Sequence, residues 1–314
     1  MTPAIRTTEL SKRYGSRTAL HGLDLTVEPG TVFGLIGPNG AGKTTTLRML
    51  LDIIRPTSGT ARVLGENPRT GGPALRRRIG FVPGELRLEG RVTGRALLRH
   101  YAEISGPVAP GAIDTLAERL GLDLTRQVRT LSKGNKQKLG LVQAFLHAPE
   151  LLVLDEPTSG LDPLVQREFL TMVREARDNG QTVLLSSHVL SEIQQTADVV
   201  AVLSRGRVVA EGAVESLRLA SIRRVRAGLG DTTVDAVRAS LAGIPQVGDL
   251  DVADGTGLVR VTARIDGDID PVVKALAAHR VIDLAIEEPD LEESVLSLYG
   301  APASAASGEG AARA

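Results

Sequence analysis

The feature that most constrains the fold of this chain is a glycine-rich loop between a predicted strand and a predicted helix. Residues 31–36 form a short apolar run with β-formers, and residues 44–52 place their leucines on one side of a helix. Between them, residues 37–44 read Gly-Pro-Asn-Gly-Ala-Gly-Lys-Thr and fit the pattern G-x-x-x-x-G-K-[ST]. A strand, this loop and a helix in that order predict the phosphate loop of an α/β nucleotide-binding domain.

The residue types in this loop suit phosphate chemistry. Glycines let backbone N–H groups converge on phosphate oxygens, and the N-terminus of the following helix adds its dipole. We expect Lys43 to reach the β- and γ-phosphates and the Thr44 hydroxyl to ligate Mg²⁺. An ordinary glycine-rich turn is the alternative, and the flanking strand and helix argue against it. The candidate nucleotide-binding residues of the loop are Gly37, Pro38, Asn39, Gly40, Ala41, Gly42, Lys43, Thr44 and Thr45.

Two adjacent carboxylates follow a second apolar run, at residues 151–154. Ligands bind at the carboxyl edge of parallel strands, so Asp155 is placed to hold Mg²⁺ directly or through water. Glu156 is placed to orient the attacking water, because phosphoryl transfer depends on positioning and electrostatics. Taken alone, the pair would more often cap a surface turn, but the phosphate loop favours the catalytic interpretation.

His188 follows a third apolar run, at residues 182–185. We expect this strand to end beside that of Asp155, where the imidazole can contact the γ-phosphate or the attacking water. A lone histidine is more often structural or exposed, and we expect that of the other four: His21, His100, His147 and His279.

The rest of the chain predicts two domains and a tail. Apolar runs without strict alternation, at residues 151–154, 182–185 and 199–203, predict parallel strands covered by helices. Predicted helices at 93–104 and 113–122 interrupt this rhythm and indicate an inserted helical subdomain, at about 87–140 of a first domain spanning 1–215. Residues 216–300 then predict a small α+β, ferredoxin-like domain. Its expected elements, in βαββαβ order, are a strand at 222–229, a helix at 234–241, a hairpin at 250–252 and 258–265, a helix at 270–279 and a strand at 281–286, followed by a helix at 291–299. The tail, 301–314, is rich in Ala, Ser and Gly and is expected to be disordered.

Composition excludes several kinds of partner and site. The 314 residues carry a net charge of zero, 2% aromatic residues and no Trp, which argues against nucleic acid as a partner. The absence of Cys excludes disulfides and cysteine metal sites. No apolar run approaches the ~20 residues that a membrane-spanning helix needs, and the N-terminus lacks a signal-peptide core. We therefore expect a soluble chain, for which another protein would supply any membrane spans.

The order of these motifs resembles the nucleotide-binding subunit of ATP-binding cassette (ABC) transporters, over residues 5–212. Residues 131–137, Leu-Ser-Lys-Gly-Asn-Lys-Gln, match the family's signature loop, and residues 159–162 match its D-loop, which ends at Asp162. The resemblance implies an α/β P-loop NTPase fold, ATP and Mg²⁺ as cofactors, and Lys43, Glu156 and His188 as the catalytic residues. It also implies that Tyr14 stacks on adenine, with a half-buried strand tyrosine as the competing interpretation.

The resemblance further implies two protein partners. Ser132 and Gly134 would contact the γ-phosphate held by a second ATP-binding subunit, and since this chain has one such set, it should pair with itself or with a similar chain. An integral membrane permease would be the other partner, contacted through residues 87–104. The chain would then work as a peripheral subunit on the cytoplasmic side of the cell membrane.

The chain departs from the family at two places. Lys133 and Asn135 replace a glycine and a glutamine of the signature loop, and Gly84-Glu85 stands where the family normally has a glutamine. Lys133 either adds charge near the partner's nucleotide or points to solvent, and whether Glu85 replaces the glutamine stays open. The signature variant, together with a C-terminal domain that ends Glu-Pro-Asp-Leu-Glu-Glu-Ser-Val-Leu at 288–296, resembles the drug-exporter branch, which includes daunorubicin-resistance-type ATPases.

The function expected from this resemblance is ATP hydrolysis that powers export of a drug-like or lipid-like substrate. One alternative is a soluble ABC-type ATPase that acts on ribosomes or DNA. Such relatives usually carry two cassettes, long coiled coils or basic extensions, which this chain lacks. A second alternative is a regulatory subunit that holds ATP without hydrolysing it, and the missing glutamine keeps it open.

Overall fold

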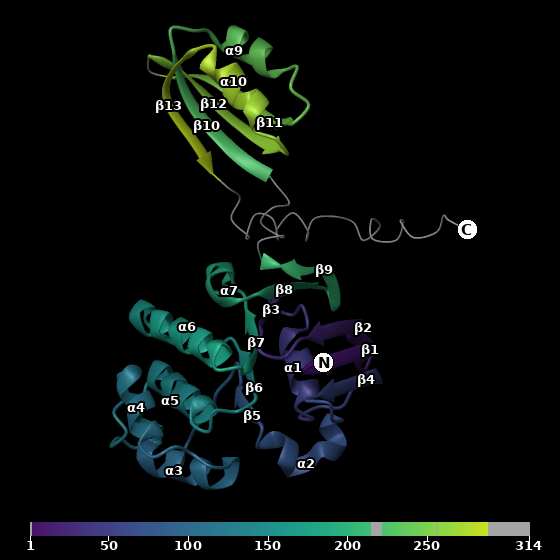
Figure 1. Cartoon of the computed structure of the whole chain (residues 1–314), viewed down its shortest axis with the longest axis vertical. Coiled ribbons are helices and arrows are strands. Elements are labelled where there is room, and N and C mark those ends of the chain that lie inside the picture. The colour runs from purple at the N-terminus through teal and green to yellow at the C-terminus, as the bar shows by residue number, and fades with distance from the viewer. Residues whose placement is uncertain (1, 215–221, 256, 288–314) are drawn as a thin grey trace, which may run out of the picture. The chain divides into compact units, whose positions relative to one another are not determined.

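The computed structural model describes residues 2–214, 222–255 and 257–287 (Figure 1). The chain divides into two compact units, residues 1–214 and 215–314. None of the helices within the described ranges is long and apolar enough to cross a membrane. Each unit has a hydrophobic core of its own, so each is described by itself.

A six-stranded sheet forms the centre of the first unit. Its order is β5-β6-β7-β3-β8-β9, and all neighbours are parallel except β8 and β9. The parallel strands predicted at 151–154, 182–185 and 199–203 are confirmed, whereas the antiparallel edge strand β9 was not predicted. The strands are β3 (Val32–Ile36), β5 (Ile79–Val82), β6 (Leu151–Asp155), β7 (Thr182–Ser187), β8 (Val199–Ser204) and β9 (Arg207–Ala213).

A second, three-stranded antiparallel sheet was not predicted from the sequence. It consists of β1 (Ile5–Tyr14), β2 (Arg17–Val27) and β4 (Ser58–Val63) in the order β2-β1-β4. Its apolar side chains share one buried cluster with the large sheet and with the helix α1 (Lys43–Leu50), as the side chains of Leu20, Phe33 and Leu47 illustrate. This shared core fixes β1 and β2 beside the phosphate loop.

The helices at 93–104 and 113–122 are present as α3 (Gly94–Ser105) and α4 (Ala112–Arg119). Thr93 caps α3, since its hydroxyl accepts the N–H of Ala96 at 3.2 Å. In Figure 1, α3 and α4 gather with α5 on the side of the unit away from β1, β2 and β4. The remaining helices are α2 (Pro68–Arg76), the 3₁₀ turn η1 (Val128–Thr130), α5 (Lys133–Phe145), α6 (Pro163–Asp178) and α7 (Leu190–Thr196).

The second unit has a four-stranded antiparallel sheet in the order β11-β12-β10-β13. Its βαββαβ sequence of elements is that of ferredoxin-like domains. The helix expected at 291–299 and the tail expected at 301–314 lie outside the described residues. The described elements are β10 (Ile222–Gly230), α9 (Val234–Leu241), β11 (Val247–Gly255), β12 (Leu258–Asp266), α10 (Asp270–Ala277) and β13 (Arg280–Glu287).

Candidate functional site

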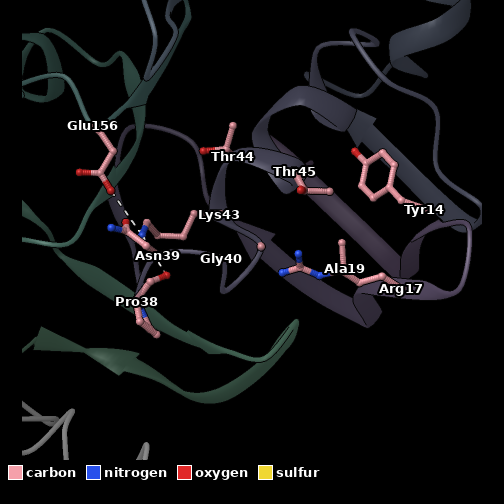
Figure 2. A pocket seen from close by; sticks show the side chains of 11 residues that line it. Tyr14, Arg17, Ala19, Pro38, Asn39, Gly40, Lys43, Thr44, Thr45 and Glu156 are labelled. Carbon is pink, nitrogen blue, oxygen red and sulfur yellow. Dashed lines mark hydrogen bonds and ion pairs between the residues drawn. The ribbon is translucent and has the colours of Figure 1, made fainter.

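A pocket of about 420 Å³ lies over the phosphate loop (Figure 2). One side is formed by the hairpin of β1 and β2, the floor by the loop and the start of α1, and the far side by Glu156 at the end of β6. The lining residues are Tyr14, Arg17, Ala19, Pro38, Asn39, Gly40, Gly42, Lys43, Thr44, Thr45 and Glu156.

The phosphate loop ends in a sharp turn into α1. Gly42 caps the helix with φ of +115°, a backbone conformation that favours glycine. The helix therefore starts at Lys43 with its N-terminus at the pocket, a place that attracts anions. The Lys43 ammonium is held over the loop, because its Nζ donates to the carbonyl oxygen of Gly37 at 2.6 Å.

The end of β6 brings a carboxylate to this lysine. The Oε1 atom of Glu156 lies 3.3 Å from Lys43 Nζ, and its Oε2 atom contacts Nδ1 of His188. The strand before Asp155 was expected to lie beside the strand before His188, and this is confirmed because β6 pairs directly with β7 and His188 follows β7. Glu156 itself has φ of +48°, and its N–H donates to the carbonyl oxygen of Ser186 at 3.1 Å. The three predicted catalytic side chains are thus in contact, with Glu156 between Lys43 and His188.

Asp155 is a buried carboxylate, with 2% of the residue exposed. Its Oδ1 atom accepts the hydroxyl of Ser186 at 2.6 Å, and within the described residues no cationic side chain pairs with it. Burying an ionised carboxylate is costly unless a cation or strong donors compensate it. The Thr44 hydroxyl lines the pocket, and both side chains offer the kind of oxygen ligand that a hard cation such as Mg²⁺ prefers.

Gly84 stands at the position where the resemblance predicts a glutamine. A Cβ atom on Gly84 would lie 3.1 Å from Oδ2 of Asp155, so the backbone of Gly84 lies against the buried carboxylate. The carboxylate of Glu85 instead pairs with Arg87 at 3.1 Å and is 73% exposed. It is therefore Gly84, and not the Glu85 side chain, that lies beside Asp155.

Tyr14 lines the opposite end of the pocket and is 50% exposed. The Nζ atom of Lys12 lies 5.0 Å from the centroid of its ring. Arg17 and Ala19 on β2 line the same end and were missed from the sequence. The Nη2 atom of Arg17 would lie 3.8 Å from a Cβ atom on Gly40, and Figure 2 shows its guanidinium directed toward the loop. Only one indication of this role for Arg17 is present in the sequence, which is that a basic residue follows Tyr14, the predicted adenine contact, after three positions.

The predicted signature and D-loop residues do not line this pocket. Ser132 caps α5, with its hydroxyl accepting the N–H of Asn135 at 3.2 Å. Asp162 caps α6, with Oδ1 accepting the N–H groups of Leu164 and Val165 at 3.1 Å each. The structure therefore places Ser132 and Asp162 at helix N-termini, apart from the Lys43–Glu156 pair.

Comparisons with known proteins agree with this geometry. The sequence profile of the ABC transporter family matches residues 20–159. Bacitracin transport ATP-binding protein BcrA of Bacillus licheniformis is 41% identical over 214 residues, which cover 67% of this chain and 70% of that protein. Daunorubicin/doxorubicin resistance ATP-binding protein DrrA of Streptomyces peucetius is 36% identical over 324 residues, which cover 99% of this chain and 97% of the relative. A solved structure of the ATP-binding subunit of an ABC transporter aligns with a TM-score of 0.64 and 31% identity, over 69% of this chain and 92% of its own.

The phosphate loop, the parallel sheet and the carboxylates at its edge define a P-loop ATPase. The similarity to DrrA, which extends over nearly the whole length of both proteins, assigns the chain to one family within this class. The chain belongs to the ABC transporter family, as one of its ATP-binding, ATP-hydrolysing proteins.

Proposed function

We propose that this chain hydrolyses Mg²⁺-ATP in the described pocket to power export through a separate membrane subunit. The observation that supports this best is the ion pair between Lys43 and Glu156. A γ-phosphate bound by the Lys43 ammonium would lie within reach of a carboxylate that can orient water. Positioning and charge stabilisation of this kind supply most of the catalysis in phosphoryl transfer.

The remaining side chains take roles that follow from their positions. Tyr14 stacks on the adenine, and the loop from Gly37 to Thr45 surrounds the phosphates with N–H groups. Asp155 and Thr44 hold Mg²⁺, which when bound neutralises charge on the phosphate oxygens. His188 contacts Glu156 and so orients the carboxylate toward the γ-phosphate.

The ATPase works as a pair of chains. Ser132 and Gly134, at the N-terminus of α5, contact the γ-phosphate bound to the partner chain, and Asp162 lies at the same interface. The N-terminus of a helix is a suitable place to receive that anion. Their placement outside this chain's own pocket supports the assignment.

Transport is inferred from the relatives. One is named for bacitracin transport and another for daunorubicin/doxorubicin resistance. We infer a drug-like or lipid-like cargo, a separate integral membrane permease that contacts residues 87–104, and a peripheral position on the cytoplasmic side of the cell membrane. These names favour export over the alternative of a soluble ATPase acting on ribosomes or DNA.

Two measurements test this proposal. Purified chain mixed with Mg²⁺-ATP should release inorganic phosphate; absence of release would favour a regulatory subunit that only holds ATP. Affinity recovery of the chain from detergent-solubilised membranes should bring an integral membrane protein with it. Recovery of ribosomes or DNA in its place would support the soluble alternative and contradict the export function.

A further inference from the structure

The loop that carries Glu156 is supported from one side by the helix α5. Gln137, in the second turn of α5, is 3% exposed, and its Nε2 atom donates to the carbonyl oxygen of Pro157 at 2.9 Å. Pro157 directly follows Glu156. A buried amide that loses its acceptor costs about 1–3 kcal/mol, so this hydrogen bond constrains both partners.

The backbone at Glu156 needs such support. Its φ of +48° lies in the left-handed region, which costs about 1–2 kcal/mol for a residue other than glycine. Two hydrogen bonds hold it: Ser186 on β7 accepts the N–H of Glu156, and Gln137 donates to the carbonyl oxygen of Pro157. A change at either contact alters where the Glu156 carboxylate points.

A second contact joins α5 to the far end of the same loop. A Cβ atom on Gly134 would lie 2.8 Å from the carbonyl oxygen of Gly160, so the first turn of α5 and the loop are packed directly against each other. The aliphatic stem of Lys133 also lies within 3.7 Å of where a Cβ atom on Gly160 would be. Residues 156–160 therefore follow any movement of the N-terminal turns of α5.

From these contacts we infer that Gln137 is a positioning residue that couples the two ATP sites of the pair. The N-terminal end of the same helix carries Ser132 and Gly134, which face the partner's ATP, while Gln137 one turn further along holds the loop of this chain's Glu156. Binding of ATP at the partner's site thus determines, through α5, the position of the Glu156 carboxylate at this chain's own site. This inference rests on the proposed function as a two-site ATPase.

The test replaces Gln137 with methionine, which has a similar volume and no amide. Steady-state hydrolysis should show kcat reduced about tenfold, because a small misplacement of a catalytic group is costly, while KM for ATP changes less than about twofold. The Hill coefficient for ATP should fall from above 1 toward 1. The melting temperature is measured alongside. A merely structural role would lower the stability of the folded chain without lowering kcat at a nearly constant KM.

Gln143→Met is the matched control. Gln143 lies on the same helix, is half-buried, and makes no side-chain hydrogen bond to a described residue. Its variant should keep the wild-type kcat and Hill coefficient. Gln137→Asn has an amide that is one methylene too short to reach Pro157, so it should also lower kcat at a nearly constant KM. This variant replaces Gln137→Met in the test if the methionine variant folds poorly.

The inference is overturned if Gln137→Met keeps the wild-type kcat, or if the control Gln143→Met changes the kinetics as much as Gln137→Met does. It is also overturned if activity falls only in proportion to folded protein with an unchanged Hill coefficient, or if the wild-type chain itself has a Hill coefficient of 1. Absence of hydrolysis in the wild-type chain would instead contradict the proposed function, so the two failures can be told apart.

Discussion

At the scale of single residues, the pocket is organised by charge. Lys43 and the N-terminus of α1 supply positive potential at the loop, and Glu156 and Asp155 supply carboxylates at the sheet edge. The loop residues could be predicted from the sequence because they are contiguous and each glycine has a steric reason. Arg17 could not, because it reaches the pocket through the pairing of β1 with β2 and has no fixed spacing from the loop.

Arg17 is expected to strengthen binding of the phosphates. Its guanidinium is exposed, lies beside Gly40 and makes no ion pair with a described residue. Arg17→Gln should weaken ATP binding about three- to tenfold, since hydrogen bonds to charged groups contribute about 1.5–3 kcal/mol before solvent screening. Adenosine affinity should stay unchanged, and calorimetric titration measures both.

Arg13 provides the control for this prediction. It is an exposed arginine on the same hairpin that does not line the pocket, so Arg13→Gln should leave ATP affinity at the wild-type value. Equal losses for ATP and adenosine in Arg17→Gln would show that the guanidinium does not act on the phosphates.

His147 makes stability depend on pH. Both ring nitrogens are buried, and this burial lowers the pKa of His147 below its ordinary 6.5, against a smaller opposing effect of the backbone of Ile79. The unfolded chain therefore binds this proton more readily than the folded chain. Stability is retained above pH 6.5 and lost as the pH falls below it, until the lower folded pKa is passed.

Thermal unfolding between pH 5 and 8 measures this effect. His147→Leu should flatten the fall in melting temperature on the acid side, because the group that takes up the proton on unfolding is gone. His100→Gln, at an exposed histidine, should leave the wild-type pH dependence intact. An unchanged acid slope in His147→Leu would contradict the assignment.

At the scale of helices and strands, burial explains why some strands of the first unit could be predicted from the sequence and others could not. The strands β6 and β7 are buried along their whole length and read as apolar runs. The edge strand β9 alternates between exposed and half-buried residues and gives no such run. The pairing of β1 with β2 contains three register shifts that break the apolar alternation, and α2 is interrupted at Gly72 by a backbone that is not helical.

The cap of α6 gives a prediction for a single element. Asp162 accepts two backbone N–H groups at the first turn, so Asp162→Ala should lower the free energy of unfolding by about 1 kcal/mol. Asp162→Ser keeps a capping oxygen and should recover most of this loss, as chemical denaturation will show. Equal destabilisation by both substitutions would mean that the cap does not hold α6.

At the scale of the whole molecule, the chain consists of two units, each with its own hydrophobic core. The first holds every pocket residue discussed above, and the second packs its own cluster around side chains such as Val225, Val261 and Leu276. The ferredoxin-like element order could be predicted because its hairpin and helices are local in sequence. The contact of Gln137 with Pro157 could not be predicted, because it is a single hydrogen bond between residues that are 20 positions apart in the sequence.

In the proposed function, two chains close over two ATP molecules, and Glu156 enables the hydrolysis of ATP. Glu156→Gln keeps the size of the side chain but removes the carboxylate that orients water. The most direct test is size-exclusion chromatography with light scattering of this variant, with and without Mg²⁺-ATP, together with phosphate release. We expect a dimer that forms only with ATP, and hydrolysis reduced by at least about a hundredfold. A variant that stays monomeric with ATP, or that hydrolyses ATP at the wild-type rate, would contradict it.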